Sequence, residues 1–566
     1  MVSLVSKPLL TEAIPSGTIY ERTADSITVA FHEEFPKWAQ VLDGFESSNC
    51  RFELHRSVNR MTYKRMTQTL DAVIQTQNTR LADFRDISLR TRKAARGDAD
   101  PGKIRWFDTG LNAAQKKAVE KSLAAKDISL VHGPPGTGKT TVLIEIIRQA
   151  LARKASIFVT APSNTACDNL LERLIERKVN ALRLGHPARV GEHLREHTLD
   201  FKLALHPTVR EIEKAGADLL RLQKKFKRGS PGKSEEQALR REISLLRQEI
   251  LNLHKEVFRR VMREAEVVVG TPTSVQDRSV REKEFDLVVI DEATQATEPM
   301  AWIPITSARK VVMAGDHFQL PPTVRSKEAA QKGLAVTLFE RYHEILAEDF
   351  KTLLDRQYRM NEKIMGFSSR VFYESRLIAD ESVRTRTLSQ LKGVKKCSDT
   401  EESLLYVDTA GKGFEEKLEL GSESRYNPEE AELVLTELKK MMDAGVPASE
   451  IAVISPYSAQ VRLLTQIAGA QRAVPLHETG LEIDSVDGFQ GREKELVIVS
   501  LVRSNLTGAM GFLNDTRRMN VAMTRARRKL IVIGDSTTLS SLPFYREFIK
   551  YAEEMGAYKT AWEMEI

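Results

Sequence analysis

The stretch HGPPGTGKTT, from His132 to Thr141, decides the fold class of this chain. It follows the apolar run DISLV and precedes VLIEIIRQALA, in which apolar residues recur at helical spacing. A strand, a glycine-rich turn of the form GxxxxGK[ST] and a helix, in that order, are typical of a phosphate-binding loop. The alternative, a chance glycine-rich turn, does not explain both flanks. The sequence therefore predicts an α/β protein that holds the phosphates of a nucleotide.

The residue types in this loop suit contact with a triphosphate. Glycines let backbone N–H groups curl around phosphate oxygens, and the helix that follows presents its amino end to them. Lys139 can reach the β and γ oxygens, and Thr140 can bind Mg²⁺. The predicted nucleotide-binding residues of the loop are Gly133, Pro134, Pro135, Gly136, Thr137, Gly138, Lys139, Thr140 and Thr141.

Composition limits the class of protein. The chain has 566 residues, a net charge of +7, 41% hydrophobic and 29% charged residues, which is typical of a globular protein of several domains with a preference for polyanions. Its three cysteines, Cys50, Cys167 and Cys397, are too few and too scattered for a disulfide framework or a paired-cysteine zinc site. The amino terminus does not resemble a secretion signal, and no apolar run is long enough to cross a membrane. We therefore expect a protein that is cytoplasmic, or nuclear in a eukaryote, and not secreted.

The order of apolar segments predicts the architecture. Short strands are expected between Thr18 and His55, followed by a helix. Two sets of strand-like runs alternate with helices, which favours two parallel sheets. Between Val209 and Glu264 apolar residues recur every three or four positions on both sides of KRGSPGK, so this segment is predicted to be an antiparallel helical hairpin. Such a hairpin is either a supporting stalk or a dimerisation seam, and the stalk is the preferred interpretation.

Further polar residues stand where the chemistry of a triphosphate needs them. FDLVVIDEAT places Asp291 and Glu292 at the end of an apolar strand. Asp291 suits the Mg²⁺ shell, and Glu292 suits orienting and deprotonating water. Gln319, in GDHFQLPP, is placed to sense the γ-phosphate, and Gln115 offers the donor and acceptor that match an adenine edge.

Ten segments, taken in order, resemble the motif series of superfamily 1 helicases. They are LNAAQ, GPPGTGKT, APSNTA, VVVGTPTS, DEAT, GDHFQLPP, LDRQYRM, VISPYSAQ, DSVDGFQGREKELVIVS and NVAMTRAR. The series is similar to the superfamily 1B branch that contains the nonsense-mediated-decay helicase. GHPAR, WIPI, VDTAG and VRSN also resemble the immunoglobulin μ-binding protein 2 helicases within that branch.

The resemblance implies an architecture of two RecA-like domains. Residues 1–102 would form a small β-barrel with a helical segment, residues 103–345 the first RecA-like domain with an inserted stalk at about 205–264, and residues 346–566 the second. ATP and Mg²⁺ would bind between the two RecA-like domains. The family moves 5′ to 3′ on single-stranded nucleic acid, and we expect the chain to be a monomer.

The resemblance also separates the basic residues of RRMNVAMTRARRK, from Arg517 to Lys529. Arg525, together with Arg359 in QYRM, matches the two arginine fingers of the family, which bring planar, permanently charged groups to the γ-phosphate. The remaining cations of this stretch carry no such match and are expected on a solvated face or in nonspecific phosphate contacts; they are Arg517, Arg518, Arg527, Arg528 and Lys529. Tyr358 matches the residue that stacks on the base, and Glu493 matches the one that contacts the ribose.

One residue pair departs from the family. Asn361 and Glu362 follow QYRM where relatives commonly carry His-Pro or His, so the departure concerns the local geometry beside the first finger.

Short polar residues at the ends of several predicted strands form a second group. They match family positions that hold the backbone of a single strand without reading its bases. The predicted nucleic-acid-binding residues are Pro162, Ser163, Asn164, Thr271, Pro272, Thr273, Pro456, Tyr457, Asp484 and Ser485. For each one taken alone, an ordinary strand-to-helix turn or helix N-cap is the preferred explanation.

The sequence thus predicts an ATP- and Mg²⁺-dependent helicase and translocase that acts on single-stranded DNA or RNA. Two alternatives remain open: a ribonucleoprotein remodeller or clamp that grips the strand without unwinding, and a dimerising scaffold with a vestigial nucleotide site. The choice between DNA and RNA depends on contacts to a 2′-hydroxyl that the sequence does not locate.

Overall fold

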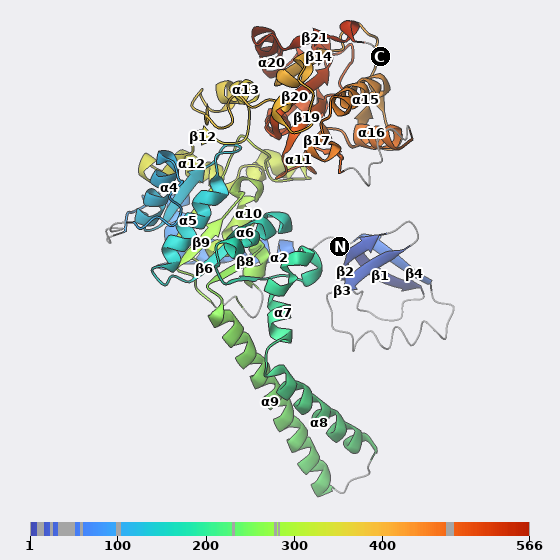
Figure 1. Ribbon diagram of the computed structural model, residues 1–566. Helices are drawn as coiled ribbons and strands as arrows, with labels where there is room; N and C mark the ends of the chain where they lie inside the picture. The colour runs from blue at the N-terminus through green and yellow to red at the C-terminus, as the bar shows by residue number, and fades with distance from the viewer. Residues whose placement is uncertain are drawn as a thin grey trace. The chain divides into compact units, whose positions relative to one another are not determined.

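The computed structural model describes residues 2–7, 16–22, 26–31, 51–56, 60–97, 104–228, 233–276, 280, 283–470 and 480–564 (Figure 1). The chain forms two compact units. Unit 1 comprises residues 1–92, 147–291 and 298–311, and unit 2 comprises residues 93–146, 292–297 and 312–566. Among the described helices, none is both long and apolar enough to span a membrane.

The first strands of unit 1 form a four-stranded antiparallel sheet in the order β3-β2-β1-β4. Its strands are β1 (Val2–Lys7), β2 (Ser16–Arg22), β3 (Ile27–Phe31) and β4 (Arg51–Arg56). The short strands predicted between Thr18 and His55 are therefore present as β2, β3 and β4. A closed barrel stays a prediction.

Unit 1 also contains four parallel strands in the order β9-β6-β8-β7. They are β6 (Ile157–Thr160), β7 (Ala181–Arg183), β8 (Val267–Gly270) and β9 (Leu287–Ile290), and every residue in them is buried. Because helices cover both faces of such a sheet, its strands are mainly apolar, with Thr160 and Arg183 as buried polar exceptions at the ends of β6 and β7. The associated helices are α2 (Arg60–Gln75), α3 (Arg80–Ser88), α6 (Asn164–Glu176) and α10 (Glu298–Ile305).

Three helices of unit 1 follow one another between β7 and β8: α7 (Leu199–Ala204), α8 (Val209–Arg228) and α9 (Lys233–Glu264). Helices α8 and α9 pack side by side and run in opposite directions (Figure 1). Near the turn, the Arg240 guanidinium lies 5.5 Å from the centre of the Phe226 ring. The two helices predicted from the apolar spacing are thus present, and their use as a stalk stays a prediction.

In unit 2, β5 (Ile128–His132) lies between β11 (Lys351–Leu353) and β10 (Val311–Gly315) in the strand order. A second, fully parallel sheet has the order β18-β17-β19-β20-β14-β21. Its strands are β14 (Leu404–Asp408), β17 (Ile451–Ser455), β18 (Glu482–Ser485), β19 (Lys494–Ser500), β20 (Ala526–Gly534) and β21 (Tyr558–Thr560). The predicted parallel α/β class is confirmed, whereas β7, β11 and β21 were not predicted.

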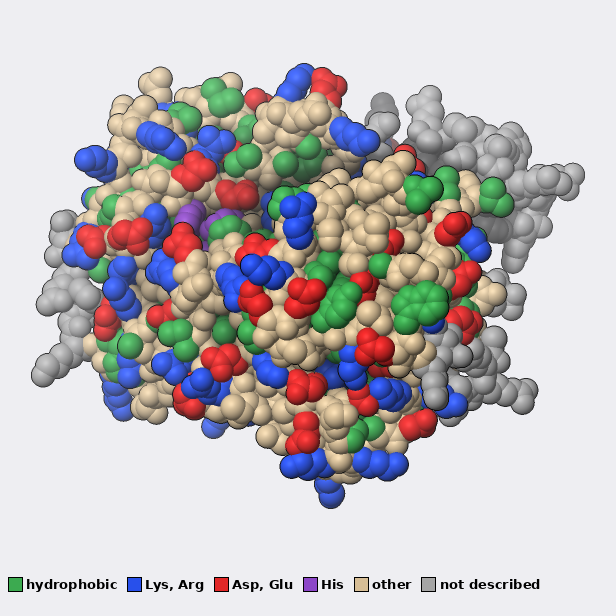
Figure 2. All heavy atoms as spheres, turned by 90° about the horizontal axis from the view of Figure 1, so that it is seen from above, with side chains coloured by type: hydrophobic (Ala, Val, Ile, Leu, Met, Phe, Trp, Pro, Cys, Tyr) green, Lys and Arg blue, Asp and Glu red, His purple; other side chains and the backbone are tan. Residues whose placement is uncertain are grey.

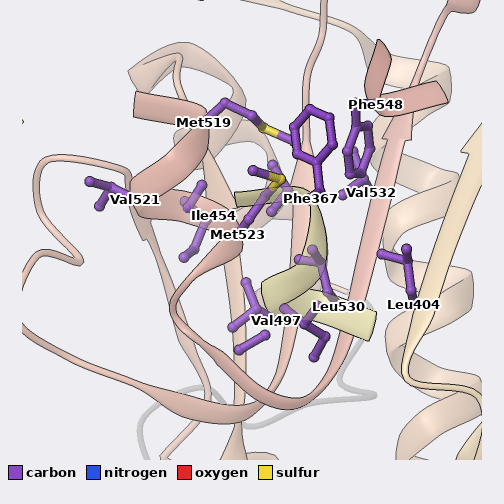
Figure 3. Packing of buried hydrophobic residues seen from close by; sticks show 14 of the residues in the cluster. Phe367, Leu404, Ile454, Val497, Met519, Val521, Met523, Leu530, Val532 and Phe548 are labelled. Carbon is purple, nitrogen blue, oxygen red and sulfur yellow. The ribbon is translucent and has the colours of Figure 1, made fainter. Parts of the chain in front are cut away.

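The larger core of unit 2 lies on one face of this second sheet. Side chains from the sheet, including Val497, Leu530 and Val532, pack against Phe367 and Phe548 from the covering helices (Figure 3). The longer helices of unit 2 are α4 (Ala113–Ala124), α5 (Lys139–Leu151, which continues into unit 1), α12 (Leu338–Ile345), α13 (Glu362–Phe372), α15 (Pro428–Asp443), α16 (Ser458–Ala470), α18 (Thr516–Met523) and α20 (Pro543–Glu554).

Candidate nucleotide site and nucleic-acid track

The predicted phosphate loop connects the buried strand β5 to the amino end of α5. Gly136 and Gly138 have φ angles of 74° and 77°, a region that side chains other than glycine rarely adopt. A Cβ atom on Gly136 would lie 2.6 Å from the Arg359 Cβ, and one on Gly138 would lie 2.7 Å from the Gln115 Nε2. The glycines are therefore required both for backbone conformation and for the close approach of two predicted site residues.

Gln115 stabilises this loop through hydrogen bonds. Its Nε2 donates to the Thr137 carbonyl at 3.0 Å, and its Oε1 accepts from the Asn112 N–H at 3.0 Å in a capping box at the start of α4. The Asn112 amide in turn donates to the Tyr358 hydroxyl at 2.9 Å. The structure thus places Gln115 and Tyr358 beside the phosphate loop, with the Tyr358 side chain 38% exposed.

Lys139 and Glu292 form an ion pair, with 2.6 Å between Nζ and Oε1. The second carboxylate oxygen of Glu292 accepts from the Gln295 amide at 2.8 Å. Glu292 also has φ 49° and ψ 39°, a left-handed conformation that is costly for a residue other than glycine and that often occurs at functional sites. The strained backbone and the ion pair hold this carboxylate at the predicted phosphate position.

The two predicted Mg²⁺ ligands fall in different units. Asp291 belongs to unit 1, where it is buried directly after β9 and its N–H donates to the Thr160 carbonyl at 2.9 Å. Thr140 belongs to unit 2, on the first turn of α5, where it is half-buried, while its neighbour Thr141 is exposed.

Arg525 and Gln319 contact each other within unit 2. The Arg525 Nη2 donates to the Gln319 Oε1 at 3.3 Å, and the Gln319 amide donates to the Asp316 carboxylate at 2.8 Å. Arg525 is 4% exposed, and its other donors bind the Val521 and Arg492 carbonyls. Burial, and next the positive charge of Arg359, lower the pKa of Arg525 to about 9, so the group stays cationic at neutral pH.

Arg359 lies beside the loop at Gly136. The N–H of its neighbour Tyr358 donates to the Gly136 carbonyl at 2.8 Å, and its own Nη1 donates to the Thr524 carbonyl at 3.0 Å. Its Nε is paired with the Glu493 carboxylate by charge, without hydrogen-bond geometry. Burial alone would raise the pKa of Glu493, but the arginines around it hold that pKa below its ordinary value. Glu493 is therefore an anion that restrains Arg359.

The other cations of the basic stretch 517–529 have different environments. Arg527 pairs with Glu493 and Glu495, and Arg528 donates to Glu495 at 2.6 Å. Lys529 is 1% exposed and donates to the Glu402 carbonyl at 2.8 Å, so a solvated face is wrong for this residue.

Several residues that the sequence interpretation did not select organise the same region. The Asp316 carboxylate accepts from the Tyr373 hydroxyl at 2.6 Å, and the Asn520 amide donates to the Phe318 carbonyl at 2.7 Å. Gln357 accepts from the Arg359 and Met360 N–H groups and thereby shapes the turn of QYRM. The only signal for them was their position beside motif residues.

Asn361, where the chain departs from the family pattern, is buried and caps α13. Its Oδ1 accepts from the Lys363 N–H at 2.8 Å, and its amide donates to the Arg386 carbonyl at 2.8 Å. The substitution is thus accommodated by a helix cap next to Arg359.

The predicted nucleic-acid residues of unit 1 lie in turns after β6 and β8. The exposed Ser163 caps α6 by accepting from the Ala166 N–H at 3.1 Å, and the Asn164 amide oxygen accepts from Arg183 at 3.0 Å. Thr271 accepts from Ser274, Pro272 is buried, and the Thr273 carbonyl accepts from Arg65 at 2.7 Å.

The corresponding residues of unit 2 lie after β17 and at the end of β18. Pro456 is half-buried, but the Tyr457 ring is 2% exposed and its hydroxyl donates to the Met510 carbonyl, so a contact at Tyr457 would come from its backbone. Asp484 accepts from Arg492 at 2.6 Å, and the Ser485 hydroxyl accepts from the Gly488 N–H.

These features define a P-loop α/β protein, and comparison with known proteins agrees. Residues 110–327 and residues 334–537 each match a family described as an AAA domain. The DNA polymerase alpha-associated DNA helicase A of Schizosaccharomyces pombe is 35% identical over 562 residues, which cover 97% of this chain and 81% of that protein. An uncharacterized ATP-dependent helicase of Methanocaldococcus jannaschii is 36% identical over 571 residues, with 94% and 81% covered.

The DNA-binding protein SMUBP-2 of Mesocricetus auratus is 39% identical over 554 residues, covering 97% of this chain and 55% of that protein. The chain therefore belongs to the superfamily 1B helicases, in the branch of SMUBP-2 and the regulators of nonsense transcripts. It spans about half the length of the SMUBP-2 relatives that it matches.

Proposed function

We propose that this chain is an ATP- and Mg²⁺-dependent helicase that moves 5′ to 3′ on single-stranded DNA or RNA and separates the duplex ahead. The observation that carries the proposal is the convergence, within unit 2, of Lys139, Glu292, Gln319, Arg359 and Arg525 around one phosphate loop. The names of its relatives, which include DNA helicases and ATP-dependent helicases, support it.

The residues present fit a triphosphate with its metal ion. Gly136 and Gly138 let the Arg359 and Gln115 side chains approach the loop closely, and Lys139 supplies a cation there. A γ-phosphate would compete with Glu292 for the Lys139 amine, which would release the carboxylate to accept a proton from water. Bound Mg²⁺, for which Thr140 is the expected ligand in unit 2, would neutralise charge on the phosphates.

The two arginines would make hydrolysis depend on conformation. Arg525 is held by backbone carbonyls and by the Gln319 amide oxygen, and Arg359 by Glu493 and a carbonyl, so each could exchange a weak acceptor for phosphate oxygens. Because Gln319 contacts Arg525, loss of the γ-phosphate from Gln319 would then change the contacts of Arg525. Gln115, Tyr358 and Glu493 would complete the nucleotide site at the base and the ribose.

The finer architecture belongs to the same proposal. We assign residues 1–102 to a β-barrel with a helical segment, residues 103–345 to a RecA-like domain with a stalk at about 205–264, and residues 346–566 to a second RecA-like domain. The turns around Ser163, Thr271, Pro456 and Asp484 would hold the strand through backbone and hydroxyl groups. Acidic and basic side chains are intermingled on the face of the molecule drawn in Figure 2.

The chain would act as a monomer in the cytoplasm or nucleus. A tail-polarity assay tests the proposal: duplexes with a 5′ or a 3′ single-stranded tail, made of DNA or of RNA, are incubated with ATP and Mg²⁺. We expect nucleic-acid-stimulated ATP turnover and unwinding of 5′-tailed duplexes only. Turnover that nucleic acid does not stimulate would refute the proposal, and displacement of a bound protein without strand separation would indicate a remodeller instead.

A further inference from the structure

Three histidines of unit 2 meet at one point. His132 ends β5 directly before the phosphate loop, His317 follows β10, and His343 lies on α12. One ring nitrogen from each lies within 4.8 Å of the other two, and this is the one group of potential metal ligands of this kind among the described residues. The three come from segments far apart in the sequence, so the fold and not a local motif brings them together.

The rings are spaced as ligands of one ion would be. The centre of the His317 ring lies 4.7 Å from those of His132 and His343, which are 5.4 Å from each other. Imidazoles that bind one tetrahedral zinc ion at about 2.0–2.1 Å place their ring centres roughly 5 Å apart. The nitrogens themselves would sit roughly 3.4 Å apart in a formed site, so small rotations of the rings would close the present arrangement.

A second observation concerns the orientation of His132. Its Nε2 lies 3.0 Å from the Asp316 carboxylate, which fixes the tautomer that carries the proton on Nε2 and leaves the Nδ1 lone pair available. Asp316 is itself held by the Tyr373 hydroxyl and the Gln319 amide. A carboxylate behind the imidazole is the arrangement that orients histidine ligands in metal sites.

A third observation concerns the other two rings. The His317 Nδ1 is buried and has no hydrogen-bond partner among the described residues, which is a cost that a metal ion would remove. Burial, and next the proximity of His132, lower the pKa of His317 to about 3 and that of His343 to about 4, so both rings are neutral at physiological pH. Neutral imidazole is the form that binds zinc.

We propose that His132, His317 and His343 form a binding site for a zinc ion, with water as the fourth ligand. Three imidazoles and no thiolate favour Zn²⁺ over Mg²⁺, which prefers oxygen ligands, so this site is chemically separate from the proposed Mg²⁺ site. The rings of Phe318, Phe339 and Tyr373 lie 4.0–6.3 Å from the nearest of these imidazoles and would exclude bulk water from the ion. The inference does not depend on the proposed function, because zinc binding requires no nucleotide turnover.

The test uses the full chain, freed of metal by a chelator and kept without nucleotide, in excess Mg²⁺. Co²⁺ is added first as a spectroscopic probe, and Zn²⁺ is then titrated against it. We expect one equivalent of Co²⁺ to give the visible absorption of a tetrahedral nitrogen site and one equivalent of Zn²⁺ to displace it. A site that binds through thiolates instead would show sulfur-to-metal charge transfer, which would contradict the assignment.

Variants identify the ligands. His343→Ala should weaken Zn²⁺ binding about 100-fold, and Asp316→Asn, which leaves all three imidazoles in place, should weaken it by about 10-fold. His254→Ala, which removes an exposed histidine on α9, is the matched control and should bind as the unsubstituted chain does. Thermal unfolding without metal checks that each variant folds. Equal Zn²⁺ affinity in His343→Ala and His254→Ala, or no binding by the folded parent chain, would overturn the proposal.

Discussion

The predicted nucleotide residues and the predicted nucleic-acid residues differ in what their side chains do. Around the phosphate loop, the predicted residues contact one another through their side chains: Lys139 pairs with Glu292, and Arg525 is buried against Gln319. Along the nucleic-acid track, the side chains have structural roles instead. Ser163 caps α6, and the Tyr457 ring is buried. Removing a side chain should therefore be severe in the first region and mild in the second.

The largest expected effect is that of Arg525→Ala. In the proposed function the buried guanidinium meets charge on the γ-phosphate, and loss of an arginine finger typically lowers turnover by about 10³-fold or more. Arg525→Lys should recover little, because lysine lacks the planar fork. The measurement is nucleic-acid-stimulated ATP turnover at saturating ATP.

The matched control for this arginine is Arg528→Ala. It removes the same charge from the same stretch, but its guanidinium is bound to Glu495 and to the Thr387 carbonyl. We expect turnover within a few-fold of the parent chain. Equal losses in both variants would show that the stretch acts through its total charge, and the distinction drawn here would fail.

The next effect is that of Lys139→Ala. The amine is the cation of the loop, and removal of one such preorganised group lowers turnover by about 10²–10³-fold. Binding of a fluorescent ATP analogue should weaken as well. The Glu292→Gln variant separates nucleotide binding from proton transfer. It should retain nucleotide affinity and still lose turnover. If it lost affinity instead, Glu292 would act in binding and not as the proton acceptor.

How far the sequence leads can be seen in these same residues. The long apolar runs predicted both parallel sheets, and the spacing of GxxxxGK[ST] predicted the loop and Lys139. The strands β7, β11 and β21 were not predicted, because each has only three residues and its apolar pattern is too short to be distinguished from a loop. Gln115 was assigned to a base edge, but its contact to the Thr137 carbonyl depends on a tertiary arrangement that spacing does not encode.

Lys529 shows the same limit in another way. The apolar residues from Leu530 to Ile533 indicate a strand, but β20 begins at Ala526, so Arg527, Arg528 and Lys529 belong to a central strand of the sheet. Lys529 is then buried by the neighbours of the strand, and burial lowers its pKa to about 8. A solvated face was predicted for Lys529 because the sequence pattern does not show where β20 starts.

Glu430 is a buried carboxyl outside both regions, and it tests whether a buried charged group must belong to a functional site. Glu430, on α15, accepts from the Ser500 hydroxyl and the Val502 N–H, and burial raises its pKa to about 7. The unfolded group ionises near its ordinary pKa of 4.5, so stability should fall as pH rises from about 4.5 to 7 and stay constant above. The loss from this one group is about 3 kcal/mol.

Glu430→Gln removes this titration while keeping the acceptor oxygen. Denaturant unfolding at pH 5 and at pH 7.5 should show the variant gaining about 2 kcal/mol relative to the parent between the two values, with ATP turnover unchanged. Parallel pH profiles would mean that Glu430 is ionised in the folded chain.

The smallest effect is expected for Ser163→Ala, which removes the cap of α6. Loss of an N-cap costs about 1 kcal/mol, and Thr79→Ala, which removes the cap of α3 in the same unit, is the matched control. Both variants should unfold at similarly lower denaturant concentrations. If Ser163 also holds a phosphate of the strand, only Ser163→Ala should weaken single-stranded DNA binding, by about 5-fold for one hydrogen bond.

Affinity that is the same in the Ser163→Ala and Thr79→Ala variants would reduce Ser163 to a cap. The grip on the strand would then have to come from backbone groups, as the burial of Tyr457 already requires in the other turn. That outcome would sharpen the contrast between the regions, because a motor that steps over any sequence can hold phosphates through main-chain donors, whereas phosphate hydrolysis requires charged side chains.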